Sequence, residues 1–248
     1  MEDKVEEVYN QRCADVYDQW FGYFDEAAVE VLEGLAGGGR ALELGIGTGT
    51  VALPLAARGV EVHGIDASPE MLAALRAKPG GVALPVTLGD FADVNVGGEF
   101  SLVYVVYNTL FALQTQEEQV RCFRNVAARL APGGVFIVEA FVPDFAQLST
   151  GQGVRFLHMT DDRVGIRVFQ HDPVGQKLKS RHVVFKDGGA QVFPVEVRYA
   201  WPSELDLMAR LAGLSLRARW GDWRRAEFDA KSEKHVSVYE RPDLTSPS

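Results

Sequence analysis

Apolar residues recur at helical spacing over the first part of the chain. Val16, Tyr17 and Trp20 belong to this series, which predicts an amphipathic N-terminal helix. A second amphipathic helix is expected over about residues 25–36. The sequence therefore predicts that the chain begins with helices.

The following segment alternates apolar strands with helices. The run from Ala41 to Thr50 predicts a strand, a glycine turn and the start of a helix, and Val60–Asp66 predicts a second strand that ends on a carboxylate. Ser68 is a good N-cap for a third helix to about residue 78, and Thr115 and Glu118 have the spacing of a capping box. This alternation, up to about residue 142, indicates a parallel sheet, whose ligands bind beyond the carboxyl ends of its strands.

The pattern changes after Pro143. Segments at about 164–170, 178–185 and 191–200 are rich in Val, Phe and Tyr and are separated by turn residues, which predicts antiparallel strands. A helix at about Ser203 to Ala212, followed by strands near residues 214–220 and 234–240, would complete the main sheet. No strand is assigned between the fifth strand and the first of these antiparallel strands, where residues 155–159 are described either as lining of the acceptor pocket or as a loop with a polar face.

These patterns divide the chain into five parts. They are an N-terminal helical lid (1–36), a Rossmann-like core (37–142), an antiparallel β cap (143–200), the end of the core sheet (201–242) and a tail (243–248).

Composition limits the classes of partner. The 248 residues carry a net charge of −9, which disfavours a broad electrostatic grip on nucleic acid. The sequence contains no apolar run long enough to span a bilayer, and its acidic start is unlike a secretory signal, so we expect a cytoplasmic protein without membrane contact. Cys13 and Cys122 form no C-x-x-C pair and the five histidines form no cluster with ligand spacing, so neither a disulfide framework nor a metal site is expected.

The glycine turn after the first strand predicts a nucleoside site. Gly45, Gly47 and Gly49 permit turn conformations and close approach of a ligand, and Asp66 would accept hydrogen bonds from a ribose diol. The spacing is G-x-G-x-G, whereas dinucleotide binding requires G-x-G-x-x-G. Glu43, just before the turn, would repel a phosphate and attract an ammonium group.

The string from Glu43 to Gly49 resembles motif I of the class I S-adenosylmethionine-dependent methyltransferases. Leu88-Gly-Asp-Phe91 is similar to the third cofactor motif of that family, residues 102–109 to its fourth strand and exit loop, and 130–134 to its turn into strand five. The resemblance implies an α/β fold with a Rossmann-like, doubly wound, seven-stranded sheet whose last strand is antiparallel.

The resemblance also implies the cofactor, S-adenosylmethionine, and its contacts. In related enzymes a tyrosine of the N-terminal segment lies near the methionine carboxylate of the donor, and Tyr17 resembles it. The expected cofactor-binding residues are Tyr17, Glu43, Leu44, Gly45, Gly47, Gly49, Asp66, Ala67, Met71, Asp90, Phe91 and Tyr107.

The acceptor is expected to be a small molecule. The antiparallel insertion resembles the cap of small-molecule methyltransferases, including sugar N-methyltransferases, and such a cap is also a possible surface for a homodimer. Some sugar N-methyltransferases have a histidine just after the fourth strand, whereas this chain reads Thr109-Leu-Phe-Ala-Leu113, so a base cannot be borrowed from that position.

No motif singles out the residues that meet the acceptor. The candidates for proton transfer are His158, His182 and Tyr23, with His171, Tyr9 and Glu139 as further possibilities. The candidates for acceptor binding are Tyr9, Trp20, Asn108, Arg155, Phe156 and Met159. The sequence leaves open whether the methyl group goes to nitrogen or to oxygen. It also leaves two other functions open, a noncatalytic cofactor-binding partner and an NAD-dependent Rossmann oxidoreductase.

Overall fold

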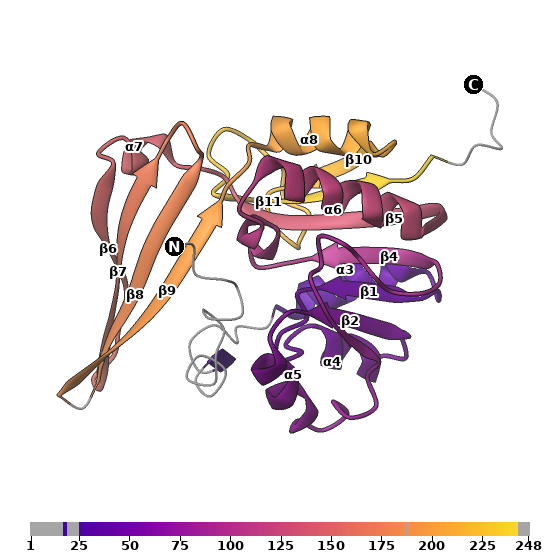
Figure 1. Cartoon of the computed structure of the whole chain (residues 1–248), viewed down its shortest axis with the longest axis horizontal. Coiled ribbons are helices and arrows are strands. Elements are labelled where there is room, and N and C mark those ends of the chain that lie inside the picture. The colour runs from indigo at the N-terminus through magenta and orange to yellow at the C-terminus, as the bar shows by residue number, and fades with distance from the viewer. Residues whose placement is uncertain (1–16, 19–24, 187, 243–248) are drawn as a thin grey trace.

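The main sheet of the computed structural model has seven strands in the order β10-β11-β5-β4-β1-β2-β3 (Figure 1). The structure describes residues 17–18, 25–186 and 188–242. The strands of this sheet are β1 (Ala41–Leu44), β2 (Val62–Asp66), β3 (Val86–Leu88), β4 (Phe100–Val105), β5 (Leu130–Phe141), β10 (Ser215–Trp220) and β11 (Lys234–Glu240). Only β11 runs against the other six, because it pairs antiparallel with both β5 and β10. The predicted doubly wound sheet with an antiparallel last strand is confirmed.

Helices cover both faces of this sheet. They are α3 (Glu26–Ala36), α4 (Ala52–Ala57), α5 (Pro69–Arg76), the 3-10 helix η1 (Thr109–Ala112), α6 (Gln116–Arg129) and α8 (Pro202–Leu211). Alternate residues of β5 enter two separate cores: Val135 and Ile137 pack with residues of α3, α4 and α5, whereas Phe136 and Val138 pack with α6 and α8.

Two of the predicted helix starts have the expected caps. The Ser68 hydroxyl accepts a 3.1 Å hydrogen bond from the Met71 N–H at the start of α5. At the start of α6, the Thr115 hydroxyl accepts from the Glu118 N–H at 3.1 Å and the Glu118 carboxylate accepts from the Thr115 N–H at 3.0 Å. The predicted N-terminal helix lies outside the described residues, except that Tyr17 and Asp18 are helical.

A second, antiparallel sheet stands beside the carboxyl edge of the main sheet. After the short helix α7 (Phe145–Leu148) its strands follow in chain order, β6 (Gln152–Met159), β7 (Arg163–Asp172), β8 (Lys177–Lys186) and β9 (Gly189–Arg198). The three expected antiparallel strands are thus present, together with a fourth, β6, that was not assigned from the sequence. Residues 152–159 form an edge strand, and a register shift between Phe156 and His158 disrupts the alternation that would have revealed it.

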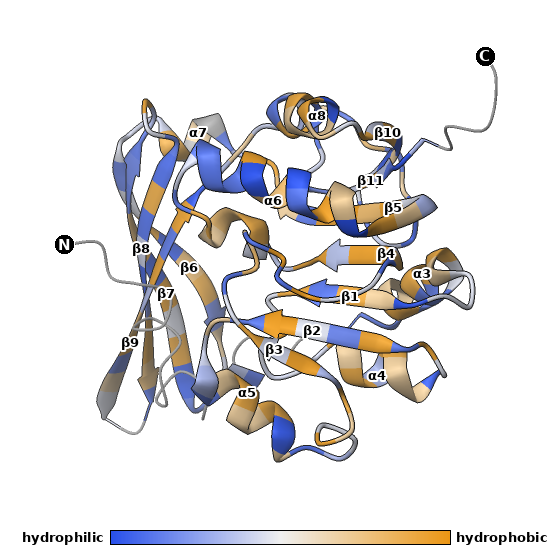
Figure 2. Ribbon diagram, turned by 45° about the vertical axis from the view of Figure 1, so that its right-hand side comes forward, coloured by the Kyte–Doolittle hydropathy of each residue, from blue (hydrophilic) through white to orange (hydrophobic). Residues whose placement is uncertain are grey.

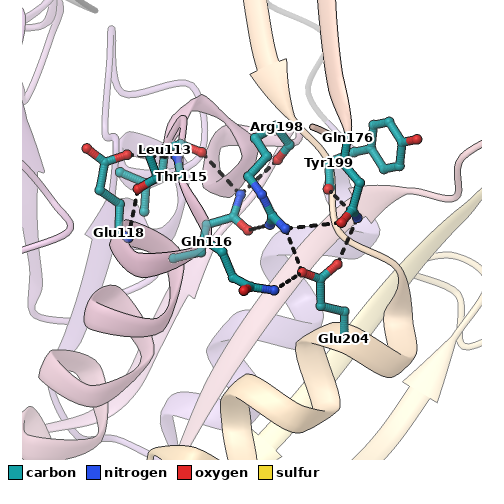
Figure 3. A network of polar contacts seen from close by, with 9 residues as sticks. Leu113, Thr115, Gln116, Glu118, Gln176, Arg198, Tyr199 and Glu204 are labelled. Carbon is teal, nitrogen blue, oxygen red and sulfur yellow. Dashed lines mark hydrogen bonds and ion pairs between the residues drawn. The ribbon is translucent and has the colours of Figure 1, made fainter. Parts of the chain in front are cut away.

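A buried polar network joins the base of this cap sheet to the core (Figure 3). The guanidinium of Arg198, at the end of β9, donates to Gln119 of α6 and to Glu204 of α8, each at 2.6 Å, and to Gln176 at 3.2 Å. Gln119 donates in return to the Arg198 carbonyl at 2.8 Å. Since Arg198 is only 7% exposed, this ion pair is well shielded from water and fixes the position of the cap.

Candidate cofactor and acceptor site

The glycine turn after β1 forms one wall of a pocket. Gly45 and Gly47 have φ angles of +70° and +53°, which L side chains rarely adopt. A Cβ atom at Gly45 would lie 2.4 Å from Thr109 Cγ2, and one at Gly47 would lie 3.3 Å from Met71 Cε. Gly49, at +79°, differs in its surroundings, because its Cβ would lie 2.3 Å from Leu75 Cδ1 on α5. Gly49 therefore permits close packing of the turn against the helix.

Asp66 closes the opposite side of this turn. Its Oδ2 accepts a 2.7 Å hydrogen bond from the Gly47 N–H, and its Oδ1 accepts one of 2.9 Å from the Ser68 N–H. Burial raises the pKa of Asp66, against the opposing effect of these two N–H groups and that of Ala67. The carboxylate is thus oriented by backbone at the end of β2, where a ribose diol is expected.

The pocket brings together most of the predicted cofactor contacts. Its lining comprises Tyr17, Gly45, Gly47, Asp66, Ala67, Met71, Phe91, Thr109 and Ala112. Thr109 and Ala112 were not among the predicted cofactor residues, of which Tyr107 was the one named after the fourth strand. They belong to η1, a turn of helix that the pattern of residues 109–113 did not reveal. An oriented carboxylate, two bare glycine backbones and the apolar side chains of Met71 and Phe91 fit a nucleoside.

Asp18 attaches the N-terminal segment to the glycine turn. Its carboxylate accepts a 2.6 Å hydrogen bond from the Thr48 hydroxyl and lies 2.6 Å from the Lys78 ammonium. Lys78 also donates to the Thr48 carbonyl at 2.8 Å. These contacts hold the neighbouring Tyr17 at the pocket. Asp18 and Lys78 were not predicted from the sequence, because they are 60 residues apart and belong to no motif.

Glu43 is buried within the fold, 3% exposed. The Tyr104 hydroxyl of β4 donates to its Oε2 at 3.0 Å, and the Ala52 N–H at the start of α4 also hydrogen-bonds to it. Burial raises the pKa of Glu43 to about 8, with a smaller contribution from the negative charge of Asp66. Leu44, its neighbour, packs in the core. The direct role of both residues toward the cofactor stays a prediction.

The loop after β4 has an unusual backbone. Tyr107 and Asn108 both have positive φ angles, +55° and +66°. Glu139 of β5 holds this loop, since its Oε2 accepts from the Tyr107 N–H at 3.1 Å and its carbonyl accepts from the Asn108 N–H at 3.2 Å. Asn108 Oδ1 accepts from the Phe141 N–H at 2.6 Å. Such strained loops are frequent at functional sites.

The remaining predicted cofactor residue, Asp90, is exposed. Its Oδ1 accepts a 2.7 Å hydrogen bond from the Ala92 N–H, so that it orders the turn that carries Phe91 into the pocket. Contact between Asp90 and the cofactor stays a prediction.

The carboxyl ends of β1, β2 and β4 point toward the cap sheet (Figure 2). One face of that sheet, here called the inner face, carries Phe169 and Leu178, which pack in the core. Cross-strand register places Arg155, His158 and His182 on this inner face, and Phe156 and Met159 on the outer face. The shift in register around Leu157 turns His158 inward, although Phe156 two positions earlier is outward.

The cap histidines have distinct environments. The His158 ring covers Gly165, whose Cβ would lie 2.4 Å from His158 Cε1. Burial, together with the positive charge of Arg167, lowers the pKa of His182 to about 4. His171 is held between the Leu148 carbonyl at 3.0 Å and the Tyr199 hydroxyl at 2.9 Å.

Glu139 is fully engaged as an acceptor. In addition to the Tyr107 N–H, its carboxylate receives the Trp223 indole N–H at 3.0 Å and lies 3.4 Å from the Lys234 ammonium. Three donors therefore occupy the carboxylate that the sequence offered as a possible base.

Three predicted acceptor or catalytic residues, Tyr9, Trp20 and Tyr23, lie outside the described residues. Within residues 17–18, 25–186 and 188–242, no group of three His, Cys, Asp or Glu side chains is arranged to hold a metal. In the same part of the chain, no helix is both long and apolar enough to cross a membrane.

Known proteins share this architecture. A family model described as a methyltransferase domain matches residues 41–134. The cypemycin N-terminal methyltransferase of a Streptomyces species is 30% identical over 205 residues, which cover 82% of this chain and 84% of that protein. The solved structure of the CcbJ methyltransferase from Streptomyces caelestis is 41% identical, covers 95% of this chain and 98% of its own, and has a TM-score of 0.88.

A more distant relative has been solved with the cofactor bound. CalS10 from Micromonospora echinaspora, an amino pentose methyltransferase solved with SAM bound, is 24% identical, covers 97% of this chain and 99% of its own, and has a TM-score of 0.67, which shows a shared fold. These findings do not favour the alternatives of a noncatalytic partner or an NAD-dependent oxidoreductase. With its glycine turn, Asp66 and pocket in place, the chain belongs to the S-adenosylmethionine-dependent methyltransferases.

Proposed function

We propose that this enzyme methylates an amine nitrogen of a small molecule. The methyl donor, when bound, supplies a methyl group made electrophilic by a sulfonium. The glycine turn and Asp66 hold the donor at the carboxyl edge of the sheet, and the inner face of the cap bounds the space in front of it. The relative named as an N-terminal methyltransferase supports an amine acceptor, because a peptide N-terminus is an amine.

One observation carries the choice of nitrogen over oxygen: three of the four described side chains that were offered as bases, Glu139, His171 and His182, are poorly suited to take a proton. Glu139 already receives three donors, and His171 is held at both ring nitrogens. His182 is uncharged at neutral pH, but its lowered pKa makes it a weak base. A hydroxyl acceptor needs a base, whereas an amine that arrives neutral needs only alignment and exclusion of water.

His158 and His182 are proposed to contact the acceptor instead of removing its proton. Both project from the inner face of the cap, and neither belongs to the wall of the cofactor pocket. They would orient the acceptor by hydrogen bonds.

A labelled-methyl transfer screen tests this function. Small amines should accept label from S-adenosylmethionine, and the matched alcohols should not. The apparent pKa of kcat/KM should follow the pKa of each amine, because only the neutral form reacts. Transfer to an alcohol with equal efficiency would overturn the choice of nitrogen, and absence of transfer to any amine would overturn the proposed activity.

The outer face of the cap supports a second proposal, a homodimer. Val154, Phe156 and Met159 on this face are 68%, 60% and 70% exposed, and Phe185 and Val192 extend the apolar surface across the sheet. A second copy presenting the same face would cover it. Light scattering should give a dimer that Phe156→Asp converts to a monomer, whereas Val174→Asp, at a 94% exposed turn position, should leave it unchanged. A monomeric wild-type protein would contradict the proposal.

A further inference from the structure

Four side chains form a row across the inner face of the cap sheet. Register aligns Arg155 of β6 with Arg167 of β7, Arg167 with His182 of β8, and His182 with Phe193 of β9. The neighbouring row toward the base of the sheet contains Phe169 and Ser180, each 5% exposed. The arginine row lies next to this row and contains Phe193, which is 7% exposed, on the same inner face of the cap.

Neither arginine of this row is paired with a carboxylate in the part of the chain that the structure describes. Arg167 Nε is buried and has no hydrogen-bond partner, and its guanidinium lies 5.6 Å from the centre of the Phe169 ring. The pKa of Arg167 is lowered by burial and by the positive charge of Arg155. Like charges directly opposite one another on paired strands destabilise a sheet. Among the described residues, no carboxylate offsets this repulsion.

Basic residues on the other face of the same sheet are arranged differently. Lys179 and Arg181 share the carboxylate of Glu196, at 3.5 and 3.9 Å. Within the described residues, the lack of a carboxylate partner is therefore particular to Arg155 and Arg167 and is not a general property of basic residues on this sheet. The chain carries nine more negative than positive charges, so carboxylates are plentiful elsewhere.

We propose that Arg155 and Arg167 bind an oxyanion of the methyl acceptor, either a carboxylate or a phosphate. The guanidinium group matches the planar, paired oxygens of both groups. The stacking of Arg167 on Phe169 would hold its fork in place, and His182 would add a hydrogen bond to the same group. This inference rests on the proposed function and deepens it: the acceptor is an amine that also carries an acidic group, and the row orients its amine toward the donor.

Binding of simple anions tests the site without turnover. Inorganic phosphate and acetate are titrated at constant ionic strength while the His182 ring signals are followed by NMR, with assignment by His182→Gln. At least one anion should give a saturable shift. Arg155→Gln and Arg167→Gln should each weaken that binding about tenfold or more, a change of about 1.4 kcal/mol. The control Arg181→Gln, on the outer face, should leave it unchanged.

The anion that binds more tightly identifies the acidic group of the acceptor: phosphate indicates a phosphate group and acetate a carboxylate. Absence of saturation by both anions, or equal weakening in Arg181→Gln, would overturn the subsite. Arg167→Lys keeps the positive charge but not the paired N–H donors of the guanidinium. It should bind the anion more tightly than Arg167→Gln and less tightly than the wild-type protein. Unchanged affinity for adenosylhomocysteine in every variant shows that the cofactor pocket is intact.

Turnover separates this inference from the proposed function. An amino acid is compared with its amide, and an amino sugar with its phosphate ester. One anionic member should have the higher kcat/KM, and Arg167→Gln should remove that preference. If all amines are methylated without any preference for charge, the subsite is wrong and the activity stands. If phosphate or acetate binds at the row but no amine is methylated, the subsite stands and the proposed activity is wrong.

Discussion

The carboxylate of Asp18 lies 2.6 Å from the ammonium of Lys78, at the C-terminal end of the helix that begins beside Asp66. The same carboxylate accepts the Thr48 hydroxyl proton at 2.6 Å. One side chain thus connects the N-terminal segment, the glycine turn and α5. Because Tyr17 is the adjacent residue and lines the cofactor pocket, these contacts hold Tyr17 in place there.

Replacement of Asp18 by Asn should weaken cofactor binding more than folding. The ion pair is partly exposed and should contribute at most about 1 kcal/mol to the free energy of unfolding. Loss of the position of Tyr17 should reduce adenosylhomocysteine affinity about fivefold to tenfold, measured by calorimetry. Glu61→Gln, which breaks the exposed Arg40–Glu61 pair, is the control and should leave affinity unchanged. Equal affinities for the two variants would contradict a role for Asp18.

Asp66→Ala should reduce adenosylhomocysteine affinity by about 1–3 kcal/mol, the usual range for hydrogen bonds to a charged group. The mutant should still fold, although the Gly47 and Ser68 N–H groups lose their acceptor. Calorimetry and circular dichroism on the same sample separate the two effects. A folded mutant with wild-type affinity would remove Asp66 from the cofactor site.

Gly47 and Gly49 should respond differently to a side chain. At Gly47 an added Cβ has only Met71 Cε nearby, at 3.3 Å, so Gly47→Val should fold but lose adenosylhomocysteine binding. At Gly49 the Cβ would lie 2.3 Å from Leu75 and 3.1 Å from Leu53, so Gly49→Val should lower stability itself, by about 1–3 kcal/mol. Urea unfolding and calorimetry on both variants check this difference. A destabilised Gly47→Val, or a Gly49→Val of wild-type stability, would contradict it.

The buried Glu43 carboxyl should make stability fall as the pH rises. Its pKa in the folded protein is about 8, above the ordinary value of 4.5, so the native state holds one more proton between these values. The stabilising contribution is complete below about pH 4.5 and is lost as the pH rises through 8. From about pH 7 to 8 the free energy of unfolding should drop by about 1 kcal/mol. The Glu43→Gln variant should show a flatter profile in urea titrations, and parallel profiles would disprove the assignment.

His182→Ala should impair turnover of the acceptor while adenosylhomocysteine affinity stays normal. The side chain lies on the cap and outside the pocket wall, so only interactions with the acceptor are lost. We expect kcat/KM to fall about tenfold or more. His158→Ala should act in the same direction, with a smaller effect, since its ring is held over Gly165. Wild-type kcat and KM in both variants would make these histidines packing residues.

Local signals predicted most of the core. The capping box at Thr115, the serine cap at Ser68 and the carboxylate at the end of β2 depend on residues close together in the sequence, and the structure has all of them. The glycine turn was equally readable, because positive φ angles favour glycine.

Contacts between distant segments could not be predicted in this way. The partner of Glu43 is Tyr104, which faces it only because β1 and β4 pair in that register. Arg155 and Arg167 come together only after β6 pairs with β7, and the shift around Leu157 decides which neighbours share a face. A pattern of period two fails at such a bulge, so β6 was not assigned from the sequence.

The polar network around Arg198 secures the cap at one end, while the turn between β8 and β9 lies at the other. Residues of this network contact both the cap sheet and the helices of the core. Substitutions there are therefore expected to lower the stability of the whole fold. Farther along the strands a side chain can change without disturbing the motifs that hold the cofactor. If the cap contacts the acceptor as proposed, substitutions along its strands would change acceptor preference and leave binding of the methyl donor intact.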